Sequence, residues 1–202
     1  MVVLGSHNSW SYLPPKHWWM RPFAFMAKCQ KADIKTQYLK YGVRCFDLRI
    51  LFEENITSLV YLDSPIVAHG IIEYKIYDWQ LQSDLGWLDI KGDCLIRVVN
   101  EVRRKSQYTE DNRYYFRNFC YFIERRYSNI RFFGGMNLYN KEVDYEFKYS
   151  FIEPTYEESH VSVSKYKYWL GWWPWLYAKI NNKRIRSNGT DRQILMIDFV
   201  NL

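Results

Sequence analysis

Five side chains suited to acid–base or phosphate chemistry lie in or beside apolar runs typical of β-strands: His7, Asp47, Arg49, His69 and Asp198. Each histidine follows such a run, where a strand opens into a loop, and an imidazole at a strand end is a common acid–base group. An arginine guanidinium is suited to bidentate binding of phosphate oxygens. Together these groups predict phosphodiester cleavage, in which one histidine accepts a proton from the attacking hydroxyl and the other returns one to the leaving oxygen.

The carboxylates of this set each need a buried partner. Asp47 and Arg49 are two residues apart in an apolar run, so both are expected on one face of a strand. Burying them is costly unless each is paired, and the two therefore also fit a structural ion pair. Asp198 lies between Ile197 and Phe199, and its desolvation cost predicts a donor beside it, such as an imidazole N–H.

The elements that must position these residues follow from hydrophobic patterning and breakers. Strands are expected at 2–4, 43–51, 59–62, 64–70, 94–101, 130–133 and 193–200. Helices are expected at 24–41, where Gly42 would be the C-cap, at 76–90 and 111–127, and briefly after the aromatic block 168–177. The unbroken apolar centre of 94–101 predicts a strand buried on both faces. Strands alternating with helices predict an α/β fold with parallel strands.

The composition fits one globular domain over residues 1–202, with 48% hydrophobic residues. The net charge of +6 allows anionic partners, but Lys and Arg are dispersed rather than patterned, so nucleic-acid binding is not favoured. The four cysteines lie far apart, and Cys45 and Cys94 are expected as buried thiols rather than parts of a disulfide framework or zinc site. No apolar run approaches 18 residues and Met1 abuts the first predicted strand, so neither a membrane span nor a secretory signal is expected.

Three motifs resemble the X-region of phosphatidylinositol-specific phospholipases C. They are Gly-Ser-His-Asn-Ser at 5–9, Gly-Val-Arg-Cys-Phe-Asp-Leu-Arg at 42–49 and Ala-His-Gly at 68–70. Residues 94–101 resemble the next strand of that family and 197–200 its closing strand, whereas about 102–190 are not matched. The resemblance implies a distorted or incomplete TIM-type (β/α) barrel.

The resemblance also implies a role for each residue. His7 would be the general base on the inositol 2-hydroxyl, oriented by Asp198, and Arg49 would hold the phosphate with Asp47 beside it. His69 would be the general acid toward the diacylglycerol leaving group. The products would be diacylglycerol and inositol 1,2-cyclic phosphate.

The Asp-x-Arg motif places the chain with the metal-independent, bacterial type of the family, for which no cofactor is expected. The calcium-dependent type has a second acidic residue where this chain has Arg49, and a fixed cation there would repel calcium. Bacterial-type members usually have Asp where this chain has Asn8, and that Asp supports the acid histidine. Asn8 supplies no negative charge, so His69 would be less readily protonated. Arg97 and Glu101 share one strand face and could meet ring hydroxyls or pair with each other.

Aromatic residues near the predicted site suit contact with lipid headgroups. Trp18 and Trp19 follow the His7 loop, and Trp172, Trp173 and Trp175 bracket a proline. Rim aromatics among Lys and Arg suit shallow insertion at a membrane surface, although ordinary burial explains such residues as well. The expected partner is therefore a phospholipid bound peripherally, while the compartment and oligomeric state stay undetermined by the sequence.

Three alternatives to a metal-independent phospholipase C-like lyase differ in class. The first is a barrel that binds a phosphoinositide or lipid headgroup with weak or no turnover, motivated by Asn8 and the short chain. The second is a calcium-dependent glycerophosphodiesterase, which would need a Glu-x-Asp metal pair that Asp47-x-Arg49 lacks. The third, nucleic-acid binding, has only the basic charge in its favour.

Overall fold

The computed structural model describes residues 3–52, 65–102, 104–140, 142–150, 156–158, 173–188 and 194–202. Its strands are β1 (Val3–Ser6), β2 (Cys45–Leu51), β3 (Ile66–His69), β4 (Ile72–Glu73), β5 (Leu95–Asn100), β6 (Arg131–Asn137), β7 (Tyr156–Glu158) and β8 (Ile194–Ile197). Its helices are α1 (Ile34–Tyr41), α2 (Asp78–Lys91), α3 (Glu110–Arg126) and α5 (Pro174–Asn188), with 3-10 segments η1 (Trp18–Met26) and η2 (Lys105–Gln107).

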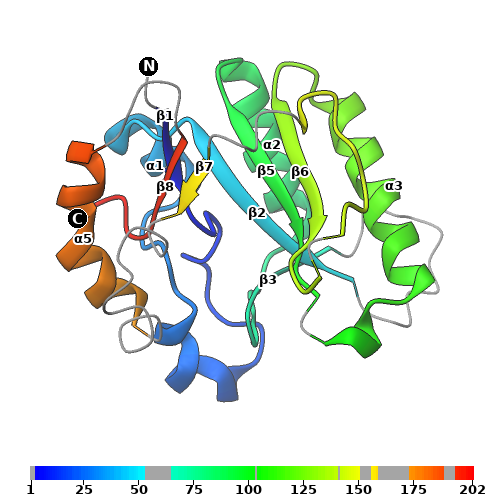
Figure 1. Ribbon diagram of the computed structural model, residues 1–202, viewed down its shortest axis with the longest axis horizontal. Coiled ribbons are helices and arrows are strands. Elements are labelled where there is room, and N and C mark those ends of the chain that lie inside the picture. Colours follow the sequence, from blue (N-terminus) through cyan, green and yellow to red (C-terminus); the bar gives the residue numbers. More distant parts are fainter. Residues whose placement is uncertain are drawn as a thin grey trace.

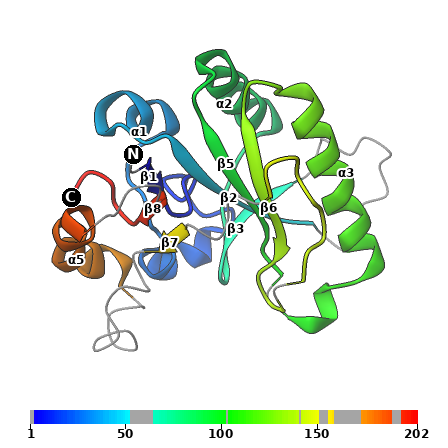
Figure 2. The ribbon, with the colours of Figure 1, turned by 45° about the horizontal axis from the view of Figure 1, so that its top comes forward.

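The strands form a mixed sheet in which β7, β8, β1, β2, β5 and β6 lie in that order and pair in parallel. The hairpin β3–β4 is the antiparallel part, and β3 pairs with the C-terminal end of β2 on the edge that β1 occupies near its start. Figures 1 and 2 show α5 at one end of the molecule and α3 at the other, with the strands between them. The predicted α/β fold with parallel strands is confirmed.

A barrel closure is not found among the described residues. β6 and β7 are the outer strands of the parallel set and do not pair with each other. The sequence-based expectation of a TIM-type barrel therefore holds only for its mixed α/β character, and the sheet is open. The predicted strand at 59–62 lies outside the described residues, as does the 168–172 part of the aromatic block.

The two faces of the sheet carry different side chains because neighbouring residues of a strand point in opposite directions. On one face Phe46, Leu48 and Ile96 join the main core, which α1, α2 and α3 cover. On the other face Cys45 and Leu95 form a small apolar cluster together with residues of β6 and β8. The polar residues Asp47, Arg49 and Arg97 share this second face by strand parity and follow the small cluster along the strands.

Local chemistry sets the helix ends. Asp33 caps α1 by accepting a hydrogen bond from the backbone N–H of Thr36, and Gly42 ends the helix in the left-handed conformation, as predicted. Thr109 caps α3 in the same way. The predicted helix over 24–41 is wrong in its first half, where η1 and an irregular segment precede α1. The backbone N–H groups of Cys29 and Gln30 donate to the Ser11 hydroxyl, so they do not take part in a continuous α-helix through this segment.

Strand β6 continues beyond its predicted end at Phe133, through Gly134 and Gly135 to Asn137. Both glycines have positive φ angles, and the register between β5 and β6 shifts at this point. A side chain on Gly134 would lie 2.6 Å from the carbonyl oxygen of Val98. The glycines thus allow a bulge that a residue with a Cβ atom would not permit.

Candidate active site

The loop after β1 places His7 and is fixed by serine hydroxyls. The Ser9 side chain accepts a hydrogen bond from the backbone N–H of Asp47 at 2.8 Å, and the Ser9 N–H donates to the Asp47 carbonyl. The Ser11 hydroxyl accepts from the N–H groups of Cys29 and Gln30. All these side chains are buried. The loop is therefore attached both to β2 and to the segment that follows η1, which limits the positions open to the imidazole.

His7 lies between an acid and a guanidinium. Its Nδ1–H donates to Asp198 Oδ1 at 2.7 Å, and its Nε2 accepts from Arg49 Nη2 at 2.8 Å. The contact with Asp198, which the sequence analysis expected from desolvation cost, fixes the tautomer and leaves Nε2 as the basic atom. Because Arg49 occupies that lone pair, Nε2 cannot accept a further proton while this hydrogen bond is formed.

Arg49 is also held by two carboxylates. Its Nε donates to Asp47 Oδ2 at 2.7 Å, and Nη1 lies 3.6 Å from Glu101 Oε2. Arg97 Nη1 lies 3.6 Å from the other oxygen of Asp47, and Asp47 Oδ2 also accepts from the N–H of Asn8. Burial opposes ionisation of Asp47, but the charges of Arg49 and Arg97 outweigh it, so its pKa is below the usual value. The ion pair that the sequence left open is therefore present.

Glu101 forms a hydrogen bond with the loop after β3. Its Oε1 accepts from the N–H of Gly70 at 2.9 Å, which positions the residue next to His69. Burial raises the pKa of Glu101, and the Arg49 charge offsets only part of this effect. The sequence suggested that Arg97 and Glu101 could meet ring hydroxyls or pair with each other. In the structure Arg97 contacts Asp47, while Glu101 contacts Arg49 and Gly70.

His69 reaches the site from an unexpected direction. It ends β3, which runs antiparallel to β2, so it is not at the end of a parallel strand as the sequence suggested. Its Nδ1–H donates to the Ala27 carbonyl at 3.0 Å, and its ring centroid lies 5.2 Å from that of His7 at an interplanar angle of 88°. Burial, and then the positive charge of Arg49, lower the pKa of His69 to about 3. The free site thus holds a neutral imidazole.

Asn8 lies beside the two histidines in strained backbone. Its φ angle is 44°, a conformation that asparagine adopts more readily than most residues. Its carboxamide is buried, makes no hydrogen bond of good geometry, and lies near the Tyr74 hydroxyl. Burial raises the pKa of Tyr74 well above its usual value, and Asn8 offsets only part of this effect. Tyr74 itself donates to the Ala27 carbonyl that His69 also uses.

His7, Cys29 and His69 form a group whose potential ligand atoms lie within 4.8 Å of one another. Burial, followed by the charge of Asp198, raises the pKa of the Cys29 thiol well above its usual value. A thiol in this state is a poor ligand, because metal binding uses the thiolate. The guanidinium of Arg49 also points at His7 and would repel a cation. All four cysteines are free and buried, which confirms the prediction for Cys45 and Cys94.

Two residues that the sequence analysis did not identify, Gln30 and Asn182, position the segment that contains Asp198. Gln30 donates to the carbonyls of His7 and Ile197 and accepts from the N–H of Val200. Asn182 of α5 donates to the Asp198 carbonyl at 2.7 Å. Both are buried amides outside any recognised motif. Their only sequence signal is a polar residue beside apolar neighbours, which does not reveal its partner.

The aromatic residues proposed for lipid contact are on the surface. Trp18 and Trp19 in η1 are 78% and 51% exposed, and Trp173 and Trp175 are also exposed, whereas Trp172 lies outside the described residues. Exposure of this size excludes ordinary core burial for these four side chains. Within the described residues, no helix is both long and apolar enough to cross a membrane.

The structure therefore brings together His7, Arg49, His69, Asp198 and Asn8, with Asp47 and Glu101 in direct contact with Arg49 and Arg97 behind Asp47. This set has the composition of a general acid–base site with a fixed guanidinium. No protein-family model matches the chain, and a search of curated proteins finds none with significant similarity to it.

Proposed function

We propose that the protein is a metal-independent phospholipase C-like enzyme that cleaves phosphatidylinositol or a related glycerol phosphodiester. The observation that carries this proposal is the placement of His7 between Asp198 and Arg49, with the ring of His69 across from it. A phosphodiester needs a base, an acid and a positive charge around one phosphorus atom, and these three groups are adjacent here.

The reaction would begin when the phosphate takes Arg49 away from His7. His7 Nε2 then accepts the proton of the inositol 2-hydroxyl as its oxygen bonds to phosphorus, and Asp198 stabilises the resulting imidazolium. The bond from phosphorus to the glycerol oxygen breaks, and His69 Nε2 gives that oxygen a proton. The products are inositol 1,2-cyclic phosphate and diacylglycerol. Exposed Trp18 and Trp19 would hold the enzyme at the membrane surface during this reaction.

The acid step depends on a charge that the free site lacks. Burial and Arg49 keep His69 neutral, and Asn8 provides no negative charge to counter them. A bound phosphate would do so, because an anion between Arg49 and His69 favours the imidazolium. Protonation of His69 is therefore coupled to substrate binding in this proposal.

The experiment is an assay of phosphatidylinositol cleavage with EDTA present, read by 31P NMR for the cyclic phosphate. We expect turnover in the unaltered protein and a loss of about 10³-fold or more in His7→Ala, since the base is removed. His17→Gln is the matched control, because His17 is exposed; it is assayed on a short-chain monomeric substrate so that membrane contact plays no part. Turnover that is absent, or that survives in His7→Ala, rules the proposal out.

A non-catalytic phosphoinositide or headgroup-binding protein is the second candidate. The neutral state of His69 beside Asn8 favours it, because a site without an acid binds phosphate but releases no alcohol. Vesicle binding without diacylglycerol release would establish this alternative. Asn8→Asp separates the two candidates further. Under the catalytic proposal the new carboxylate raises the pKa of His69, and the rate of cleavage rises by about tenfold. An equal or lower rate would show that Asn8 is adapted to another role.

A further inference from the structure

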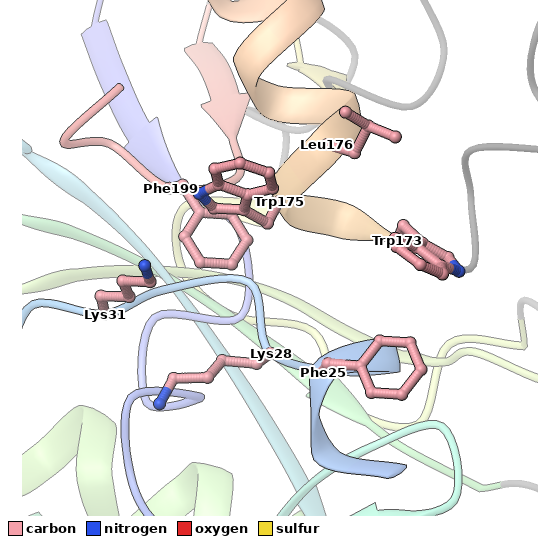
Figure 3. Close-up of a pocket in the computed structure, with 7 residues that line it drawn as sticks. All are labelled: Phe25, Lys28, Lys31, Trp173, Trp175, Leu176 and Phe199. Carbon is pink, nitrogen blue, oxygen red and sulfur yellow. The ribbon is translucent and has the colours of Figure 1, made fainter. Parts of the chain in front are cut away.

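An apolar pocket lies between η1 and α5, outside the proposed catalytic site (Figure 3). Its volume is about 410 Å³, within the range of small-molecule sites, and its walls expose almost no polar atoms. The lining residues are Phe25, Lys28, Lys31, Trp173, Trp175, Leu176 and Phe199. Walls of this kind offer few hydrogen-bonding partners to a sugar, a base or a peptide. They suit a hydrocarbon group, which needs none.

The pocket has an apolar end and a basic end. Figure 3 shows Phe25 and Trp173 on one side of it, where their rings meet edge to face at 5.6 Å, and Trp175 close to Phe199. Lys28 and Lys31 lie on the other side, with their ammonium groups directed away from Phe25 and Trp173. A ligand that spans the pocket would therefore have a hydrocarbon body and a negative head.

The two lysines place positive charge at the basic end of the pocket. Neither Lys28 nor Lys31 forms an ion pair with another described residue. Lys28 is partly buried, and burial together with repulsion from Lys31 lowers its pKa. An anion placed between the two ammonium groups would relieve this repulsion. Charge complementarity thus favours an anionic amphiphile over a neutral or cationic one.

The pocket and the catalytic site are lined by neighbouring residues of the same two segments. Lys28 lines the pocket while Cys29 lies beside His69, and Phe199 lines the pocket while Asp198 binds His7. The backbone N–H of Phe199 donates to the Cys29 carbonyl and joins the two segments. The chemistry of the site therefore does not use the space in the pocket.

We propose that this pocket binds the alkyl chain of a single-chain anionic amphiphile, with the phosphate or carboxylate head beside Lys28 and Lys31. The ligand class is that of alkyl phosphates, lysophosphatidates and fatty acids. Burial of the chain provides the affinity, and each CH2 group removed from water tightens binding by up to about fourfold. This site does not require the proposed phosphodiesterase activity.

The test titrates the full chain with octyl, decyl and dodecyl phosphate below their critical micelle concentrations, by calorimetry and tryptophan fluorescence. We expect saturable binding of one molecule and a gain in affinity of about tenfold for each step of two carbons. Dodecyltrimethylammonium, which has the same chain and the opposite charge, is expected to bind about tenfold more weakly or less. Affinity that is independent of chain length, or equal for the two heads, overturns the proposal.

Two variants locate the binding. Leu176→Trp fills the pocket and is expected to weaken dodecyl phosphate at least about tenfold, which is the effect of losing two to three buried CH2 groups. The double variant Lys28→Gln/Lys31→Gln is expected to remove the preference for the anionic head without changing the fold, because Lys31 is exposed and Lys28 is only partly buried. Trp79→Ala and Lys40→Gln, both on other helices, are the controls and should bind normally. Unaltered binding in Leu176→Trp contradicts the proposal.

His7→Ala keeps this test separate from the proposed function. It should lose phosphodiester cleavage and still bind dodecyl phosphate, because His7 does not line the pocket. If the unaltered protein instead binds no amphiphile and forms dimers that Leu176→Trp prevents, the pocket is a contact between copies and the proposal is wrong.

Discussion

The two faces of β2 are both buried but contain different chemistry. We call the face of β2 that the helices cover the outer face; there Phe46, Leu48 and Ile50 are fully buried in the main core. On the opposite, inner face, Cys45 belongs to the small apolar cluster, and the next residues on that face are Asp47 and Arg49. The outer face stabilises the fold by removing apolar surface from water, whereas each charge on the inner face needs a partner to be tolerated. Stability and chemistry are thus assigned to alternate residues of one strand.

The largest expected effect tests the outer face. Phe46→Ala removes a fully buried ring and leaves a cavity, so we expect the free energy of unfolding to fall by about 3–5 kcal/mol. Urea unfolding measures this loss, and turnover per folded molecule should stay near that of the unaltered protein. Leu39→Ala, at an exposed position of α1, is the control and should change stability by less than about 0.5 kcal/mol. Similar losses in the two variants would remove the distinction between core and surface on which the comparison depends.

A conservative change on the inner face should have the opposite profile. Arg49→Lys keeps the charge but loses the planar group that contacts Asp47 and His7 at once, so we expect turnover to fall by about 10²–10³-fold. Its free energy of unfolding should fall by less than that of Phe46→Ala. Arg44→Lys is the matched control, because Arg44 pairs with Asp93 near the surface. If Arg49→Lys unfolds the protein while the folded fraction keeps full activity, the inner face is structural only.

A third prediction sharpens the comparison through pH. The pKa of His69 is about 3 in the folded protein and near 6.5 in an unfolded chain, so between these values the unfolded state binds more protons. Stability from this group is therefore complete above about pH 6.5 and is lost as the pH falls, by up to about 1.4 kcal/mol per unit. His69→Gln should flatten this part of the profile, as measured by unfolding at pH 4 to 7. If the free energy of unfolding of the unaltered protein, minus that of His69→Gln, rises toward low pH, His69 is not neutral in the folded protein.

Much of the inner face could be predicted from the sequence because strand parity is a local property. The spacing of Asp47 and Arg49 placed them together, and the desolvation cost of Asp198 predicted the imidazole that contacts it. The approach of His69 could not be predicted in this way. The apolar sequence of its strand is compatible with either a parallel or an antiparallel neighbour. The direction is set by the pairing with β2, which joins residues distant in the sequence.

The remaining differences have similar physical causes. The helix predicted over 24–41 has suitable apolar spacing, but the hydrogen bonds of Cys29 and Gln30 to Ser11 favour an irregular segment before α1. Polar residues such as Gln30 have no periodic pattern, so their role is visible only once three segments have come together. The pocket between η1 and α5 is likewise a product of tertiary packing.

The hydrogen bond from Asn182 has a mechanical consequence. Asn182 is on α5, two turns after Trp175 and Leu176, and its amide grips the carbonyls of both Asp198 and Phe199. The middle of α5 is therefore tied to the backbone of the residue whose carboxylate accepts from His7. A displacement of α5 would shift the Asp198 backbone, and with it the partner that orients the His7 ring.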